Sequence, residues 1–169
     1  KIIGNNRSRY LYGLDLNADW NGFDLRMLFQ GVGKRDWYPS LSEGGYRFYG
    51  VYLAPWGNVY ENNLDHWTPE NPDGYFPRLK SYLADGAGDM SYNQTRYLQN
   101  AAYLRCKNIT FGYTLPKQLL QKIKLNNVRI YVSGENLFEL TPLCKNFDPE
   151  QLNTTSHPLQ RTYSIGLNI

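Results

Sequence analysis

The fold of this chain is decided by residues 103–140, which read YLRCKNITFGYTLPKQLLQKIKLNNVRIYVSGENLFEL. From Ile109 onward the odd positions are apolar, and the even positions are polar or small. This two-residue period is typical of a β-strand with one apolar and one polar face. Pro116 has no N–H to donate to a sheet, so we expect the strand to end there. Within a compact connector at 117–127, residues 117–123 are expected to form one or two helical turns, and a second alternating strand begins at Val128.

The N-terminal part predicts a long β-hairpin. Apolar and polar residues alternate over 9–20 and again over 23–37. Between them stands Asn21-Gly22, the strongest short-range hairpin signal, because both positions of such a turn need positive φ. Each strand has roughly 12 residues or more, whereas strands of globular sheets usually have 5 or 6. That length suffices for a tilted crossing of a membrane.

A two-residue turn also fixes the register of this hairpin. It places Tyr12 opposite Gly31 and Tyr10 opposite Gly33, so that each ring can lie over a glycine, as happens where sheets curve. The expected cross-strand pairs on the apolar face are Trp20–Phe23, Leu16–Met27 and Leu14–Phe29. On the polar face Asn17 faces Arg26, with Asp15 and Asp19 diagonal to it.

Six short runs between residues 67 and 168 are distinctive in their sequence and order. They are WTPENP (67–72), YFPRL (75–79), RCKNITFGYTLP (105–116), RIYVSGENLF (129–138), DPE (148–150) and RTYSIGLN (161–168). Together they resemble the C-terminal end of the SusC/RagA family of TonB-dependent outer-membrane transporters. The resemblance covers most of residues 97–169. The first two runs extend it upstream, because they resemble sequences in the outer loops of that family.

The resemblance implies an all-β fold, in which antiparallel up-and-down strands form the C-terminal part of a large transmembrane β-barrel of the 22-stranded type. The whole protein would lie in the bacterial cell outer membrane, among its lipids, and import glycans or oligopeptides together with a SusD-like surface lipoprotein. TonB would supply energy through a plug segment outside this chain. The remainder of the same barrel is therefore an expected partner, and no enzyme activity is expected.

The strands and connections sort into one barrel domain over residues 1–169. The expected strands are about 9–20, 23–37, 97–115, 128–141 and 161–169. Short connections, 21–22 and 117–127, lie at one end, and the long segments 38–96 and 142–160 lie at the other. Outer-membrane barrels have short periplasmic turns and long extracellular loops, which orients the chain.

The composition indicates that the apolar residues are dispersed among polar ones. The chain has 169 residues, 15% of them aromatic, yet its mean hydropathy is negative. No run of 18 apolar residues is present, as a membrane helix would need. The net charge of +3 is spread along the sequence, so nucleic acid is not an expected partner. No catalytic, cofactor-binding or metal site is predicted, since His66 and His157 lie in separate loops without ligand spacing.

The outer loops offer the only candidates for ligand or partner contact. Their aromatic side chains could stack on sugar rings or face a partner; they are Trp56, Tyr60, Trp67 and Tyr75. The alternative is packing within the loops, which the surrounding prolines favour for Trp67 and Tyr75.

The last strand places Tyr163, Ile165, Leu167 and Ile169 on one face. The resemblance implies that this strand carries the signal read by the barrel-assembly machinery. The family usually ends in an aromatic residue two positions further on, so we expect about two residues beyond Ile169.

The two cysteines are not expected to form a disulfide. If Pro116 faces Val128, Cys106 lies opposite Phe138, roughly 20 Å along a strand from Cys144, whereas a disulfide needs Cα atoms within about 7 Å.

A soluble carbohydrate-binding β-sandwich is the alternative to the barrel. It would cover the apolar face with a second sheet, whereas the barrel turns that face to lipid. The residues that distinguish the two are Tyr12, Leu14, Leu16, Leu25, Met27 and Phe29.

Overall fold

The computed structural model describes residues 1–39, 61–81, 92–121, 124–152, 157 and 159–169. The chain divides into two compact units, where the sequence predicts one domain. The sheet unit comprises Arg7–Arg35, Ala101–Pro142 and Leu159–Ile169. The loop unit comprises Lys1–Asn6, Asp36–Asn100 and Leu143–Pro158.

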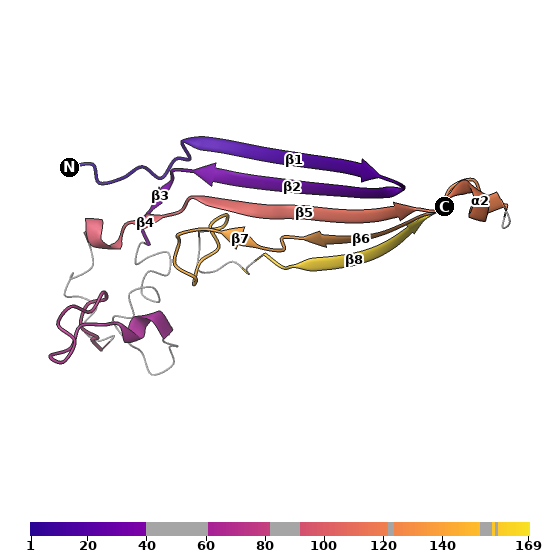
Figure 1. Cartoon of the computed structure of the whole chain (residues 1–169). Coiled ribbons are helices and arrows are strands. Elements are labelled where there is room, and N and C mark those ends of the chain that lie inside the picture. Colours follow the sequence, from indigo (N-terminus) through magenta and orange to yellow (C-terminus); the bar gives the residue numbers. More distant parts are fainter. Residues whose placement is uncertain (40–60, 82–91, 122–123, 153–156, 158) are drawn as a thin grey trace. The chain divides into compact units, whose positions relative to one another are not determined.

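The sheet unit is a single antiparallel sheet (Figure 1). Its strands are β1 (Tyr10–Trp20), β2 (Phe23–Gly33), β5 (Tyr103–Thr114), β6 (Arg129–Glu135), β7 (Glu139–Leu140) and β8 (Thr162–Asn168). They lie in the order β1-β2-β5-β6-β8, and β7 pairs with β5. Strands of this unit therefore neighbour each other in chain order, which confirms the predicted all-β, up-and-down arrangement. The sheet is open.

The β1–β2 hairpin has the predicted register throughout. Trp20 pairs with Phe23, and the ladder continues without irregularity to Tyr10 and Gly33. Asn21 and Gly22 have φ of 49° and 86°, as a primed two-residue turn requires. Because a two-residue turn allows only one register of the two strands, the turn alone fixes which side chains share a face.

Tyr12 covers Gly31, as predicted. Its ring lies where a Cβ on Gly31 would stand, and its hydroxyl donates a hydrogen bond of 3.0 Å to the Tyr103 carbonyl on β5. A Cβ on Gly33 would lie 3.4 Å from the Cβ of Tyr10 and 3.7 Å from the ring of Tyr12. The tyrosine thus links three strands at the point where the glycine provides no side chain.

The β5–β6 register differs by one residue from the prediction. Thr114 pairs with Arg129, and the Leu115 N–H donates to the Val128 carbonyl at 2.9 Å, so Pro116 does not face Val128. The physical reason is the apolar face: only this register sets Phe111 beside Val132.

An irregularity after β6 restores the pairing expected for the cysteine. Asn136 adopts a positive φ of 51° and donates its N–H to the Lys107 carbonyl. Beyond it the Cys106 N–H donates to the Phe138 carbonyl at 3.0 Å, so these two residues are opposite, as predicted. Cys106 and Cys144 are both free thiols.

Several strands end earlier than the alternation indicates. β2 ends at Gly33 because Lys34 turns the chain with a φ of 50°. The last residues of the predicted strand form β3 (Asp36–Trp37), which pairs with β4 (Gln99–Asn100) in the loop unit. The predicted strand 97–115 is likewise divided between β4 and β5, and residues 136–138 separate β6 from β7.

The short connections of the sheet unit lie at one end of its strands. The Asn21-Gly22 turn and the connector that holds α2 (Lys117–Leu120) join strands at one end. At the opposite end the chain leaves after β2 and β7 and returns at β5 and β8. No helix within the described ranges is both long and apolar enough to cross a membrane.

The loop unit has its own aromatic core. Trp37 and Phe147 pack edge to face with ring centroids 4.7 Å apart. The rings of Phe76 and Tyr97 stack at 6.4 Å, and both side chains are buried. Burial raises the pKa of the Tyr97 hydroxyl above its ordinary value. Short 3₁₀ helices at Glu61–Leu64 and Thr95–Tyr97 lie in this unit.

Candidate functional site

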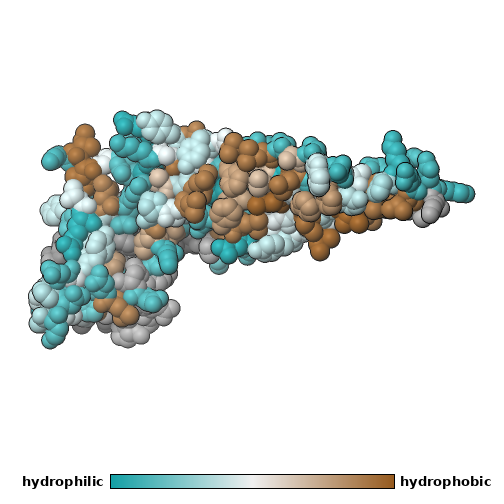
Figure 2. Space-filling model, in the orientation of Figure 1, coloured by the Kyte–Doolittle hydropathy of each residue, from teal (hydrophilic) through white to brown (hydrophobic). Residues whose placement is uncertain are grey.

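One face of the sheet is apolar and uncovered. Leu14 is 52% exposed, Phe111 45% and Ile165 83%, although hydrophobic side chains of this size are normally buried in soluble domains. Figure 2 shows hydrophobic residues gathered over the strands. A continuous apolar surface of this kind marks contact with a partner or a membrane.

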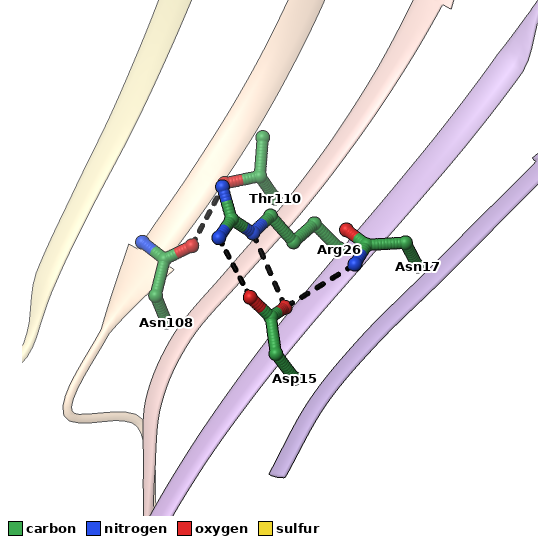
Figure 3. Close-up of polar contacts among 5 residues, drawn as sticks. All are labelled: Asp15, Asn17, Arg26, Asn108 and Thr110. Carbon is green, nitrogen blue, oxygen red and sulfur yellow. Dashed lines mark hydrogen bonds and ion pairs between the residues drawn. The ribbon is translucent and has the colours of Figure 1, made fainter. Parts of the chain in front are cut away.

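The opposite face is polar and hydrogen-bonded (Figure 3). Arg26 on β2 donates two hydrogen bonds to the carboxylate of Asp15 on β1, at 3.2 and 2.7 Å. The Asn17 amide donates to the same carboxylate at 3.4 Å, and the Thr110 hydroxyl donates to Asn108 at 2.9 Å. Charges so widely exposed need water, so this face is in contact with solvent.

A second ion pair crosses a whole strand. Asp24 on β2 accepts hydrogen bonds of 2.6 and 2.5 Å from Arg129 on β6, although β5 lies between them. The pair passes over Gly112, where a Cβ would lie 2.5 Å from both partners. Arg129 also stands 5.0 Å from the centroid of the Tyr131 ring. This pair was not predicted from the sequence; its signal is a glycine flanked by opposite charges on the two neighbouring strands.

A third ion pair lies near the opposite end of the strands. Arg105 on β5 contacts Glu139 on β7 at 2.6 Å, and Arg105 is only 1% exposed. A bulge between the partners of Leu28 and Phe29 brings Arg105 to the polar face by adding Lys107 to β5. Strict alternation from Ile109 assigns Arg105 to the apolar face, so this placement was not predictable from the period alone.

Of the candidate outer-loop aromatics, Tyr75 is engaged in packing. Its ring meets Phe76 and Tyr97 edge to face at 4.9 and 5.5 Å. Its hydroxyl donates to the Arg96 carbonyl, while the Arg96 guanidinium donates to the Tyr75 carbonyl, both at 3.0 Å. The side chain thus holds two segments of the loop unit together.

Trp67 is more open. It is 37% exposed, and the Arg78 guanidinium carbon lies 6.0 Å from its ring centroid. Trp56 and Tyr60 lie outside the described residues. Of the two predicted aromatics that the structure describes, Trp67 and Tyr75, neither is in ring contact with the other; the rings that pack on Tyr75 are those of Phe76 and Tyr97.

The loop unit also contains a cavity of about 390 Å³. Amide and aromatic side chains dominate its lining, which comprises Ile3, Gly4, Asn5, Asn6, Asp36, Trp37, Tyr38, Asn93 and Leu98. The Asp36 carboxylate accepts a hydrogen bond of 2.9 Å from the Asn5 N–H. Amide groups and one carboxylate beside aromatic rings suit a polar ligand that can form hydrogen bonds.

The last strand forms an edge of the sheet. Tyr163, Ile165 and Leu167 of β8 pair with Gly134, Val132 and Ile130. These three side chains and Ile169 are 55–83% exposed.

The sandwich alternative requires a second sheet large enough to cover the apolar face. The other sheet in the described part of the chain consists of β3 and β4, with two residues each. Such a sheet is far too small for that role. Among the described residues no group of three His, Cys, Asp or Glu side chains could hold a metal ion.

Comparison with known proteins gives relatives of one kind, although no family model matches the chain. TonB-dependent receptor P3 of Formosa agariphila is 29% identical over 184 residues, covering 100% of this chain and 17% of the relative. TonB-dependent receptor SusC of Bacteroides thetaiotaomicron is 32% identical over 88 residues, covering 50% of this chain and 8% of SusC.

Solved structures of a transporter are also similar to this chain. The RagAB peptide importer in its closed-closed state is 25% identical, with a TM-score of 0.67, over 93% of this chain and 16% of that chain. In the open-open state the TM-score is 0.64. The names describe receptors and transporters rather than enzymes. This chain spans less than a fifth of the length of these relatives.

The two-faced, open sheet and these likenesses define a wall segment of a transporter β-barrel. In sequence and fold the chain is similar to the SusC/RagA family of TonB-dependent outer-membrane transporters.

Proposed function

We propose that this chain is part of a SusC-like TonB-dependent transporter of the bacterial outer membrane, which imports glycans or oligopeptides together with a SusD-like surface lipoprotein. The observation that carries the proposal is the two-faced sheet. Its apolar face is uncovered, and its opposite face carries exposed ion pairs such as Asp15–Arg26. Lipid on one side and a water-filled lumen on the other satisfy both faces at once.

The substrate class follows the chemistry of the loop unit. Its cavity offers amides and aromatic rings, groups that can contact either sugars or peptide backbones. The RagAB relative is named a peptide importer. We therefore keep both glycans and oligopeptides as substrates, and TonB acts through a segment outside this chain.

The outer-loop aromatics and the last strand have distinct roles in this proposal. Trp56, Tyr60, Trp67 and Tyr75 lie in loops that face substrate or the lipoprotein. Trp67 is the better contact of the two described, because Tyr75 is held by Arg96. Tyr163, Ile165, Leu167 and Ile169 present the apolar face that the assembly machinery reads.

The proposal is tested on the full-length polypeptide with an affinity tag in its native cell. We expect the protein in the outer-membrane fraction, co-purifying with a lipoprotein, and we expect its deletion to abolish uptake of one glycan or oligopeptide class. Recovery in the soluble fraction would refute the membrane assignment. Unchanged uptake of both classes by the deletion strain, which retains its other transporters as internal controls, would refute the import role.

Substitution of Trp67 by alanine separates contact from packing. We expect uptake or lipoprotein binding to fall several-fold while the amount of folded protein stays unchanged, because the ring is partly exposed. Tyr75→Ala should instead lower protein abundance or increase protease sensitivity of the loops, since it removes packing and two hydrogen bonds. Equal, normal uptake in both variants would contradict the assignment of Trp67.

A further inference from the structure

The apolar face contains a shallow groove between β5 and β6. It has a volume of about 260 Å³ and almost no polar lining; the residues around it are Phe111, Gly112, Tyr113, Ile130, Tyr131 and Val132. The walls of the groove are the side chains of Phe111 and Tyr113 on β5 and of Ile130 and Val132 on β6, which share the apolar face. The side-chain position of Gly112 lies on the other face, below the Asp24–Arg129 pair. A groove lined in this way accepts a hydrocarbon chain and no polar group.

The connector at the same end of these strands is basic. From Leu115 to Val128 the sequence has three lysines and no Asp or Glu. Lys117 begins α2, and Lys117 and Lys124 are exposed. Figure 2 shows hydrophilic residues gathered around this connector, beyond the hydrophobic band of the strands.

The lysines are not neutralised by the nearest acidic groups. Asp24 is held by both guanidinium contacts of Arg129 on the polar face. Asp19 precedes the β1–β2 turn and shares that polar face with Asn17 and Asp15. Within the described residues no ion pair involves Lys117 or Lys124. Their charge is therefore available to a partner at the edge of the apolar face.

Groove and lysines lie within reach of one amphiphilic molecule. Tyr113 at the end of the groove precedes Lys117 by four residues, or about 13 Å of extended chain. Leu119 of α2, two residues after Lys117, is 53% exposed, so the connector also carries an exposed apolar side chain. An acyl chain in the groove thus places a phosphate at the level of the connector, where the lysines attract it as basic segments attract anionic headgroups.

We propose that this site binds an anionic phospholipid of the inner leaflet, with an acyl chain in the Phe111–Val132 groove and the headgroup phosphate against Lys117 and Lys124. The inference rests on the proposed function, because the short connections must face the periplasm, where the leaflet consists of phospholipid. A zwitterionic lipid fits the groove equally well but lacks the net charge that the connector attracts.

The test uses the full-length transporter purified from membranes and reconstituted in nanodiscs of phosphatidylglycerol and phosphatidylcholine in equal amounts, with bound lipid measured by native mass spectrometry. We expect several-fold more phosphatidylglycerol than phosphatidylcholine to remain bound. The Lys117→Gln/Lys124→Gln variant should lose that preference, and the charge-matched control Lys34→Gln/Lys145→Gln should keep it. Val132→Trp, which fills the groove without changing charge, should reduce retention of both lipids.

Equal retention of the two lipids by the unmodified protein would overturn the proposal, and so would an undiminished preference in Lys117→Gln/Lys124→Gln. A protein that is absent from the membrane fraction would instead refute the transporter assignment itself. Because lipid retention is measured only on protein recovered from membranes, the two failures are distinguishable.

Discussion

Replacing Leu16 with arginine is expected to destabilise the barrel by about 2–4 kcal/mol, the cost of an arginine on the lipid face near the bilayer midplane. Leu16 lies midway along β1, opposite Met27, and is 41% exposed. In the membrane this exposed surface faces hydrocarbon, which cannot solvate a guanidinium. The measurement is urea unfolding of the full-length protein in lipid vesicles, with the amount of folded barrel in cells as a second readout.

Leu28→Arg is the matched control. Leu28 is 37% exposed, almost as much as Leu16, and lies on the neighbouring strand at nearly the same depth, but it pairs with Asp15 and Asn108 on the polar face. We expect a change within about 0.5 kcal/mol, as for ordinary surface substitutions. A soluble sheet would tolerate both arginines alike. Equal effects of the two substitutions would therefore contradict the assignment of faces.

Gly31→Ala is expected to cost about 2–4 kcal/mol, from overpacking and a lost hydrogen bond together. A Cβ at this position would lie 2.6 Å from the Tyr103 carbonyl oxygen, which is backbone and cannot move cheaply. It would also displace the Tyr12 ring and break the hydrogen bond from the Tyr12 hydroxyl to the same carbonyl. The loss should appear as a lower urea midpoint in the same unfolding assay.

Gly13→Ala is its control in the same hairpin. The nearest atom to a Cβ at Gly13 is the Phe29 carbonyl oxygen at 3.6 Å, an ordinary contact, and neither glycine has a positive φ. We expect this variant to unfold like the unmodified protein. If Gly31→Ala were equally harmless, the tyrosine-over-glycine contact would not stabilise the sheet.

The β1–β2 hairpin could be predicted completely because one local signal determines it. Asn21-Gly22 fixes the turn, the turn fixes the register, and the register fixes the contact between Tyr12 and Gly31. Every step follows from neighbours in sequence, without information from the rest of the fold.

The β5–β6 pairing could not be predicted in the same way. Its connector is long enough to allow several registers, so packing of Phe111 beside Val132 selects one. The bulge at Lys107 shifts the pairing of β5 with β2 by one residue, and the positive φ at Asn136 accompanies a shift in the pairing of β5 with the strand that follows β6. Neither residue type predicts these shifts from the sequence. Arg105 changes face as a consequence.

The candidate site was predictable as a surface but not as a set of contacts. Alternation separates apolar from polar residues, yet the choice of Asp24 as the partner of Arg129 needs the strand between them and the missing side chain of Gly112. In the loop unit the aromatic residues are evident in the sequence. Only the structure shows that Tyr75 packs while Trp67 is open.

The central claim is that the apolar face meets lipid and the polar face meets water. The most direct measurement is cysteine accessibility in intact membranes, in a Cys106→Ser/Cys144→Ser background of the full-length protein. Leu14→Cys and Phe29→Cys report the apolar face, while Asn17→Cys and Gln30→Cys report the polar face.

A charged, water-soluble maleimide is expected to label Cys at positions 17 and 30 and to leave positions 14 and 29 unlabelled until detergent is added. Leu14 is 52% exposed on the sheet, so lipid is what would shield it. Labelling at 14 and 29 as fast as at 17 and 30 in intact membranes, or recovery of the protein in the soluble fraction, would contradict the account.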